Sequence, residues 1–161
     1  MIKSHEYLEN RIKWRVRKNN ALCSKVLFFE TLEKSKKQEL TTLLAFQNIG
    51  VPVVYFKGRN KNWTIIGTQK IACGNDIFAD SISYENIKNW TPYDYPLDEP
   101  KTTIEYLKAR YFGYLKRFQH KIIIEEKNGR RLIFYGPRGW KIYDIPNIIY
   151  MMQRLTKNNY E

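Results

Sequence analysis

The chain has 161 residues, with 28 Lys and Arg against 16 Asp and Glu, and a formal net charge of +12 at pH 7. This length is typical of one domain, and the 43% hydrophobic and 15% aromatic fractions exclude a chain that is disordered throughout. Cys23 and Cys73 have no Cys or His nearby, which excludes a disulfide framework and a zinc site with closely spaced ligands.

The location of the protein is expected to be cytoplasmic. Residues 1–20 are too rich in charge for a secretory signal, and the apolar runs, such as 148–152, are far shorter than the roughly 20 residues of a membrane-spanning helix. Basic side chains prevail in residues 1–60 and 101–131, whereas acidic side chains prevail in residues 61–100. This balance favours anionic partners, namely nucleic acid, an acidic membrane surface or an acidic protein, unless the charge serves solubility alone.

The first fifty residues predict helices. Residues 3–18 favour either a helix with one apolar stripe or a basic arm. Ser35 and Gln38 have the spacing of a capping box, so a second helix is expected to begin at Ser35 and to stop near Gly50. The apolar stripe of the first helix consists of Leu8, Ile12 and Val16.

From residue 51 the pattern becomes that of strands. Residues 51–56 are β-branched and aromatic, and the polar turn 57–62 joins them to residues 63–73 in a predicted hairpin. Residues 77–84 predict another strand, in which Ile77, Ala79 and Ser81 alternate with Phe78, Asp80 and Ile82. A short helical or turn segment is expected at 85–90.

The second half predicts a hairpin and a closing helix. Residues 91–120 are expected to be an insertion that contains a helix. Residues 121–136 form a hairpin in which Asn128-Gly129 suits a type I′ turn, with Glu126 facing Arg131 and Ile124 facing Ile133. Another strand is expected at 139–143, and Asp144 then caps a helix. The buried face of that helix is predicted to be Ile145, Ile148, Ile149, Met152 and Leu155.

This order of elements is that of an α+β protein. Residues 63–71 (WTIIGTQKI), residues 81–87 (SISYENI), the hairpin 121–136 and the helix that begins DIPNIIYMMQRL resemble bacterial pleckstrin-homology-like (PH-like) domains. The resemblance implies a bent antiparallel sheet, a barrel or roll packed nearly orthogonally on itself and capped by the C-terminal helix. It covers residues 51–157 with an insertion at 91–120, and it leaves residues 1–50 as an N-terminal helical extension.

The resemblance also implies an anion-binding site. Lys57, Arg59 and Lys61 lie in the hairpin that grips phosphates in members of the family, and Lys70 follows in the sequence. Arg offers a bidentate contact to phosphate, so these residues are the predicted ligand site. The family's deeper arginine has no counterpart, since residues 64–67 are neutral, and an ordinary solvated hairpin tip is the alternative.

A second candidate surface is basic and aromatic. It lies on the helix expected within the insertion, where aromatic side chains alternate with cations that can neutralise the phosphates of nucleic acid. The alternative is an amphipathic helix that packs on the sheet and keeps its charges in water. The basic residues of this surface are Lys108, Arg110, Lys116, Arg117 and Lys121.

Signals for catalysis are weak. Glu125 and Lys127 fit the acidic-x-Lys element of some metal-dependent nucleases, which also requires an upstream acid such as Asp94 or Asp98. No triad is indicated, and we predict no catalytic residue, no metal site and no cofactor.

The prediction is therefore a non-catalytic interaction module for a protein or peptide partner or for an anionic surface. The alternatives are a nucleic-acid-binding accessory protein and an immunity-type inhibitor of a toxin or nuclease.

Overall fold

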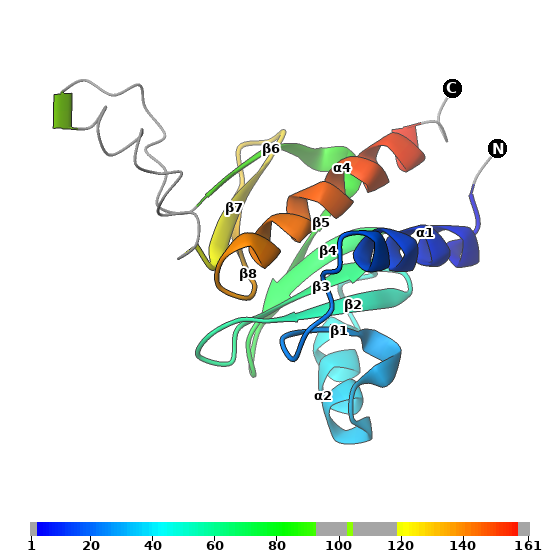
Figure 1. Ribbon diagram of the computed structural model, residues 1–161. Coiled ribbons are helices and arrows are strands. Elements are labelled where there is room, and N and C mark those ends of the chain that lie inside the picture. The colour runs from blue at the N-terminus through cyan, green and yellow to red at the C-terminus, as the bar shows by residue number, and fades with distance from the viewer. Residues whose placement is uncertain (1–2, 93–102, 105–118, 158–161) are drawn as a thin grey trace.

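The computed structural model describes residues 3–92, 103–104 and 119–157. Over these ranges the fold is α+β, with a five-stranded and a three-stranded antiparallel sheet (Figure 1). The elements are α1 (His5–Lys18), β1 (Val26–Phe28), η1 (Phe29–Thr31), α2 (Lys34–Leu44), β2 (Pro52–Lys57), β3 (Trp63–Gly67), β4 (Lys70–Gly74), β5 (Ala79–Ser83), η2 (Tyr84–Asn86), β6 (Ile87–Pro92), β7 (Lys121–Glu126), β8 (Arg131–Tyr135), η4 (Trp140–Tyr143) and α4 (Asp144–Lys157).

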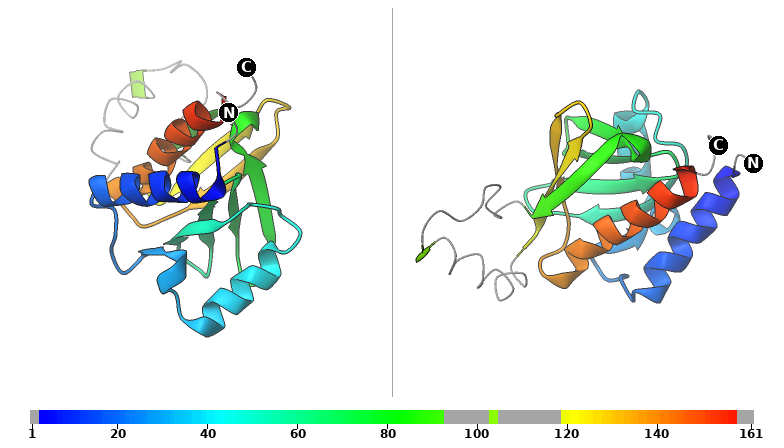
Figure 2. Two further views of the ribbon diagram at one scale, coloured as in Figure 1. Left: turned by 90° about the vertical axis from the view of Figure 1, so that its right-hand side faces the viewer. Right: turned by 90° about the horizontal axis from the view of Figure 1, so that it is seen from above.

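The two sheets and the helices form layers. Sheet A has the strand order β1-β2-β3-β4-β5, and sheet B has the order β6-β7-β8. Helix α2 covers one face of sheet A, whereas α1 and α4 lie side by side on the opposite side (Figures 1 and 2). Sheet B reaches sheet A through β8, where Tyr135 N donates to Thr64 Oγ1 at 2.9 Å.

The core lies on both faces of sheet A. Every residue of β3 is buried, so this strand needs a cover above and below. One hydrophobic cluster joins sheet A to α1, α4 and sheet B, and a second joins it to α2. Burial of this area stabilises the fold at roughly 25 cal/mol per Å².

The apolar stripes of α1 and α4 are confirmed. Ser4 caps α1 by accepting a hydrogen bond from Tyr7 N, so the stretch 3–18 is a helix from His5 onward rather than an arm. The predicted stripe of α1 is buried, and so is that of α4 except for its last member, Leu155, which is half-buried. Residues 1–50, predicted as an extension, contribute α1, β1 and α2 to the same two clusters.

The predicted bounds of α2 are wrong. The helix begins at Lys34, because Lys37 N already donates to the carbonyl of Glu33, so that Ser35 lies inside the first turn. The helix ends at Leu44, well before Gly50. Gly50 has a φ of +74°, and a Cβ atom there would lie 2.3 Å from Thr68 Oγ1, so the glycine serves a close backbone approach.

Three further predictions of secondary structure are also wrong. Residues 63–73 are not one strand, because a turn at Thr68-Gln69 divides them into β3 and β4. The segment 85–90 was expected to be helical or a turn, but only its start is η2, and β6 follows. Residues 139–143 form the 3-10 turn η4 rather than a strand. The helix predicted within 91–120 lies largely outside the described residues.

The hairpin of β7 and β8 exists, but its register differs from the prediction. Arg131 pairs with Glu125 rather than Glu126, and Ile133 pairs with Ile123. Gly129 has a φ of +89° and donates to the carbonyl of Glu126, which makes a three-residue loop with a glycine in the left-handed region. Asn128 does not have the positive φ that a type I′ turn requires, and its side chain accepts a hydrogen bond from Arg130 N.

Arg130 connects the two sheets from this loop. Its Nε donates to Glu126 at 2.5 Å, and its terminal nitrogens donate to Asp80 at 3.2 Å and to the carbonyl of Ser81 at 2.8 Å. The side chain of Glu126 is only 7% exposed. A carboxylate so deeply placed depends on its cation, because an unpaired buried charge is costly.

Replacing Arg130 is therefore expected to destabilise the protein. Arg130→Met should lower the free energy of unfolding by about 2–3 kcal/mol, less than for a fully buried pair because the guanidinium is partly exposed. Arg130→Met with Glu126→Met should lose less than the single variant, since no buried charge remains. Urea unfolding measures both. Arg131→Met is the matched control with a smaller loss, because Glu125 keeps Lys88. Equal losses for the two arginines would contradict the role of Arg130.

Candidate functional site

The turn between β2 and β3 carries three of the four predicted anion ligands. Asn60 and Lys61 have positive φ angles of 51° and 63°, which make the turn tight. Lys57 and Arg59 are exposed and make no ion pair with any described residue. Lys61 instead pairs with Asp76, and this hydrogen bond raises the pKa of the Lys61 ammonium.

Lys70 does not join this group. Trp63, next to the turn, pairs with Gly74, whereas Lys70 begins β4 and pairs with Ser83. Lys70 therefore lies at the opposite end of the strands. The structure brings together three of the predicted residues and separates the fourth.

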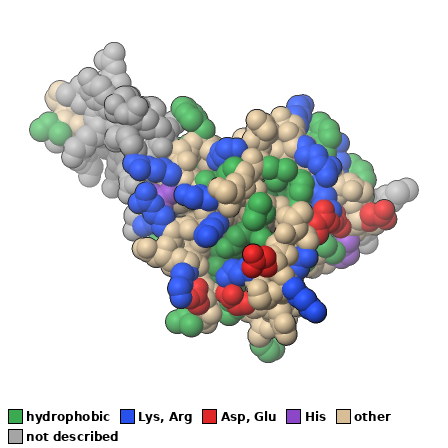
Figure 3. All heavy atoms as spheres, turned by 60° about the horizontal axis from the view of Figure 1, so that its bottom comes forward, with side chains coloured by type: hydrophobic (Ala, Val, Ile, Leu, Met, Phe, Trp, Pro, Cys, Tyr) green, Lys and Arg blue, Asp and Glu red, His purple; other side chains and the backbone are tan. Residues whose placement is uncertain are grey.

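A cleft of about 780 Å³ lies behind the turn, between α2 and strands β1 and β2. Its lining has equal numbers of cations and acids, and Lys36 pairs with Glu39 at 2.6 Å while Lys61 pairs with Asp76. Burial, with Glu39 and Asp76 nearby, raises the pKa of the Tyr55 hydroxyl at its floor. Figure 3 brings this lower side of Figure 1 forward and shows Lys and Arg side chains with acidic ones among them. The cleft itself is thus not an anion pocket.

An apolar tip stands beside the basic turn. Ile77 is 88% exposed and Phe78 is 53% exposed, in the turn between β4 and β5. Asn75 Oδ1 fixes this turn by accepting from the backbone N–H groups of both residues, at 3.0 and 3.1 Å. The ion pair of Lys61 with Asp76 joins the two turns. We call residues 57–62 and 75–78 together the hairpin end.

The sequence did not identify this apolar tip. Residues 77–84 were predicted as one strand, but β5 begins at Ala79, so Ile77 and Phe78 fall in the turn. The residues Gly74-Asn75-Asp76 indicate a turn in the sequence. The turn is longer than they predict, because the Asn75 side chain accepts hydrogen bonds from the backbone N–H groups of Ile77 and Phe78 and leaves both exposed. The hairpin end combines exposed cations with exposed apolar side chains.

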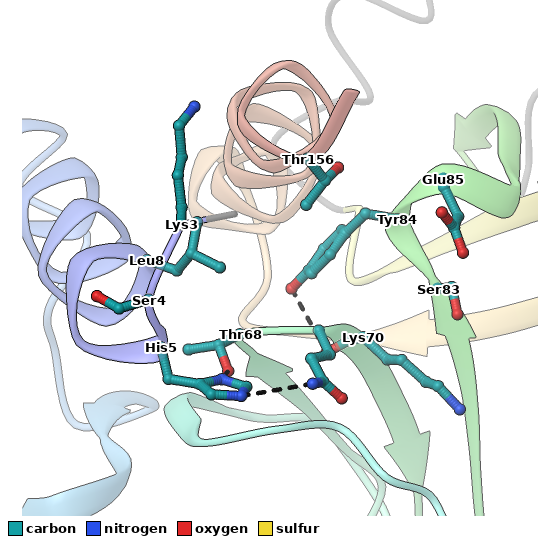
Figure 4. A pocket seen from close by; sticks show the side chains of 11 residues that line it. Lys3, Ser4, His5, Leu8, Thr68, Lys70, Ser83, Tyr84, Glu85 and Thr156 are labelled. Atoms are coloured by element: carbon teal, nitrogen blue, oxygen red, sulfur yellow. Dashed lines mark hydrogen bonds between the residues drawn. The ribbon is translucent and has the colours of Figure 1, made fainter. Parts of the chain in front are cut away.

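A second pocket, of about 460 Å³, lies where the start of α1 meets the β3–β4 turn, η2 and the end of α4 (Figure 4). His5 Nδ1 lies 2.6 Å from Thr68 Oγ1, and Gln69 Nε2 lies 3.4 Å from His5 Nε2. The Tyr84 hydroxyl donates to the carbonyl of Gly67 at 2.7 Å.

This pocket does not have the arrangement of a nucleophile and its base. Thr68 is only 1% exposed, and its hydroxyl also accepts a hydrogen bond from Val51 N at 2.9 Å, so this oxygen is held by the backbone. A nucleophile needs an accessible oxygen, and this one is enclosed. The contact of Thr68 with His5 instead fastens the start of α1 to sheet A. Lys70, predicted as an anion ligand, lines this pocket.

The predicted nucleic-acid surface lies mostly outside the described residues. Its members outside them are Lys108, Arg110, Lys116 and Arg117. Lys121 begins β7, with its Nζ 5.9 Å from the centroid of the Tyr135 ring.

The nuclease hypothesis concerns Glu125 and Lys127. Glu125 accepts hydrogen bonds from Lys88 and Arg131, both at 2.8 Å, and these bonds lower the pKa of its carboxyl. Asp94 and Asp98 lie outside the described residues. Within the described part of the chain, no group of three His, Cys, Asp or Glu side chains is placed to hold a metal ion.

The cysteines differ in accessibility. Cys23 is half-buried, and Cys73 is buried in β4. Burial, with a further contribution from Asp80, raises the pKa of the Cys73 thiol to about 12. The thiolate, which is the reactive form, is therefore scarce at Cys73 near neutral pH.

Comparisons with protein-family models and with curated protein sequences find no match for this chain. In the described ranges, no helix is both long enough and apolar enough to cross a bilayer.

Thr68→Val should destabilise the protein because it removes the acceptor of Val51 N–H and the partner of His5 while keeping the shape of the side chain. We expect a loss of about 1–3 kcal/mol in chemical denaturation. Thr42→Val is the matched control, since that exposed hydroxyl only donates to the preceding turn of α2. Indistinguishable variants would show that the contact of His5 with Thr68 contributes nothing.

Thiol labelling tests the environment of the cysteines. At pH 8 roughly one Cys73 side chain in 10,000 is a thiolate, given a pKa of about 12, so iodoacetamide should modify Cys23 in the native protein and leave Cys73 intact. Both should react after denaturation. Peptide mass spectrometry distinguishes the two sites, and rapid native labelling of Cys73 would contradict the burial of β4.

Proposed function

We propose that the chain is a non-catalytic interaction module with a PH-like fold. Support comes from the order of its elements. A meander of antiparallel strands, β2 to β5, is followed by β6 to β8 and by a closing helix that packs into the core common to both sheets. The contacts of β8 with β3 and β4 agree with the bent arrangement that the sequence resemblance implies.

The surface that fits an interaction best is the hairpin end, and its proposed partner is an anionic phospholipid surface. The observation that carries this proposal is the exposure of Ile77 and Phe78 beside Lys57 and Arg59. Apolar side chains enter the boundary between headgroups and acyl chains, while basic side chains remain with the phosphates.

The magnitudes suit reversible binding. Burial of a side chain such as Ile or Phe contributes about 1.5–3 kcal/mol, and each cation near an anionic surface adds about 1 kcal/mol. Each contribution alone is marginal, as is known for single membrane anchors, and the two together give measurable attachment. Lys61 adds less than Lys57 or Arg59 because Asp76 already neutralises it.

A protein or peptide partner is the other expectation from the sequence. Such a partner would contact the same apolar tip, since exposed apolar patches mark protein contacts as well. Its binding would not depend on lipid charge, so one experiment with vesicles separates the two partners.

We expect the protein to sediment with vesicles of phosphatidylcholine that contain phosphatidylserine, and much less with phosphatidylcholine alone. Ile77→Ser with Phe78→Ser should reduce the partition coefficient about tenfold or more, which is about 1.4 kcal/mol or more. Lys57→Glu with Arg59→Glu should reduce it similarly and weaken its dependence on salt.

The matched control is Phe46→Ser, which removes a side chain that is 92% exposed but lies outside the hairpin end. This variant should bind vesicles as the unchanged protein does. Equal partition coefficients for all variants would show that the hairpin end does not contact the vesicles. Equal binding of the unchanged protein to neutral and anionic vesicles would exclude recognition of anionic lipid.

A further inference from the structure

The outward side of α1 carries aromatic and basic residues in alternation. Its members are three or four residues apart, so the four within α1 lie along one stripe of the helix, and Lys3, which precedes the helix, lies beside Tyr7. Tyr7 is 43% exposed and Trp14 is 41% exposed, although both are large side chains. We call this surface the α1 outer stripe, and its residues are Lys3, Tyr7, Arg11, Trp14 and Lys18.

The cations of the stripe lie over its rings. Arg11 Cζ is 4.7 Å and Lys18 Nζ is 4.8 Å from the centroid of the Trp14 ring. Lys3 Nζ lies 5.9 Å from the centroid of Tyr7. These cation–π contacts hold flat aromatic surfaces and positive charge together at the exposed side of the helix.

The stripe has no acidic member, although α1 also carries Glu6, which is exposed, and Glu9. Glu9 pairs with Lys13 at 2.7 Å on the side of α1 that faces β1 and η1. The Nε atoms of Arg11, within the stripe, and of Arg15, one turn further along α1, are buried and have no hydrogen-bond partner among the described residues. Positive potential is thus concentrated along this side of α1.

The stripe continues toward α4. Lys3 Nζ donates to the carbonyl of Leu155 at 3.2 Å, and the neighbouring Arg154 is exposed. At the other end of α1, Asn19 donates to Asp144 at 3.0 Å. The two helices therefore run antiparallel, side by side, as Figures 1 and 2 show.

The apolar face of α1 is not available to a membrane. A helix that lies in a bilayer interface buries its apolar side in lipid, but Leu8, Ile12 and Val16 are buried in the protein core. The stripe itself contains no aliphatic side chain. Nor does α1 project from the surface as a helix must to enter a major groove, because it lies against α4.

We propose that the α1 outer stripe binds single-stranded nucleic acid. Bases stack on Tyr7 and Trp14, and phosphates are neutralised by the cations between them. Stacking on aromatic rings along a basic surface is the physical basis of sequence-tolerant binding of single strands. This site is independent of the hairpin end and differs from the basic residues within 108–121.

The dimensions fit a short segment. With a rise of about 1.5 Å per residue, α1 is about 21 Å long, enough for on the order of six stacked nucleotides at about 3.4 Å each. Contact of phosphates with Lys3, Arg11 and Lys18 predicts a slope of log affinity against log salt of about −2 for a single strand.

Fluorescence anisotropy with labelled dT12 and U12 tests the proposal at 50 and 200 mM salt. We expect binding at low salt, and weaker binding of a 12-base-pair duplex. Arg11→Gln with Lys18→Gln should reduce affinity tenfold or more. Trp14→Ala should reduce it about fivefold or more, whereas Trp14→Phe, which keeps a ring, should retain most of it.

The matched control is Arg17→Gln with Lys25→Gln, which removes the same charge from exposed positions outside the stripe; Arg17 lies on the other side of α1, 5.1 Å from the Phe28 ring. Its affinity should stay within about twofold of the unchanged protein. An equal loss of affinity in the control would show that the loss in the stripe variant comes from net charge alone, and would contradict the proposal. Absence of binding at 50 mM salt would overturn it. Loss of vesicle binding in the stripe variants, with nucleic-acid affinity unchanged, would assign the stripe to lipid instead.

Discussion

The complete burial of β3 is the constraint on which the rest of this fold depends. A strand whose every residue is buried needs cover on both faces, so sheet A requires two sets of partners. Helix α2 supplies one cover, and α1, α4 and sheet B supply the other. Because the interior is filled in this way, exposed groups with potential for binding are found at strand ends and on outward helix faces.

Much of the fold is readable from the sequence where the apolar period is long. The stripes of α1 and α4 extend over several turns, and both proved to be buried as predicted. Strand β6 was missed because IKNWTP shows neither alternation nor a continuous apolar run. The register of β7 with β8 was missed by one residue because a glycine loop of three residues is hard to distinguish from the two-residue turn that Asn-Gly favours.

The candidate site was only partly readable, for a related reason. The basic turn was correctly placed between two strands, since polar residues there interrupt a clear β pattern. The exposure of Ile77 and Phe78 could not be predicted from their residue types, because apolar residues next to a strand usually continue that strand. The Asn75 side chain holds both residues in the turn, because its oxygen accepts hydrogen bonds from their backbone N–H groups. The aromatic residues of α1 can be interpreted as a binding surface only after the apolar stripe of the helix is known to be buried.

The two proposed surfaces use the same charge in different ways, so salt dependence alone does not separate them. At the hairpin end the cations flank aliphatic and aromatic groups that can enter lipid, whereas on α1 they flank rings that can stack. Helix α1 is also fastened at both ends, by His5 at Thr68 and by Lys141, which donates to the carbonyls of Asn20 and Ala21 at 2.9 and 3.1 Å. A surface held in this way loses little conformational entropy on binding. The hairpin end and the α1 outer stripe share no residue, and it is the chemistry of their apolar members, rather than their charge, that distinguishes the two ligands we propose.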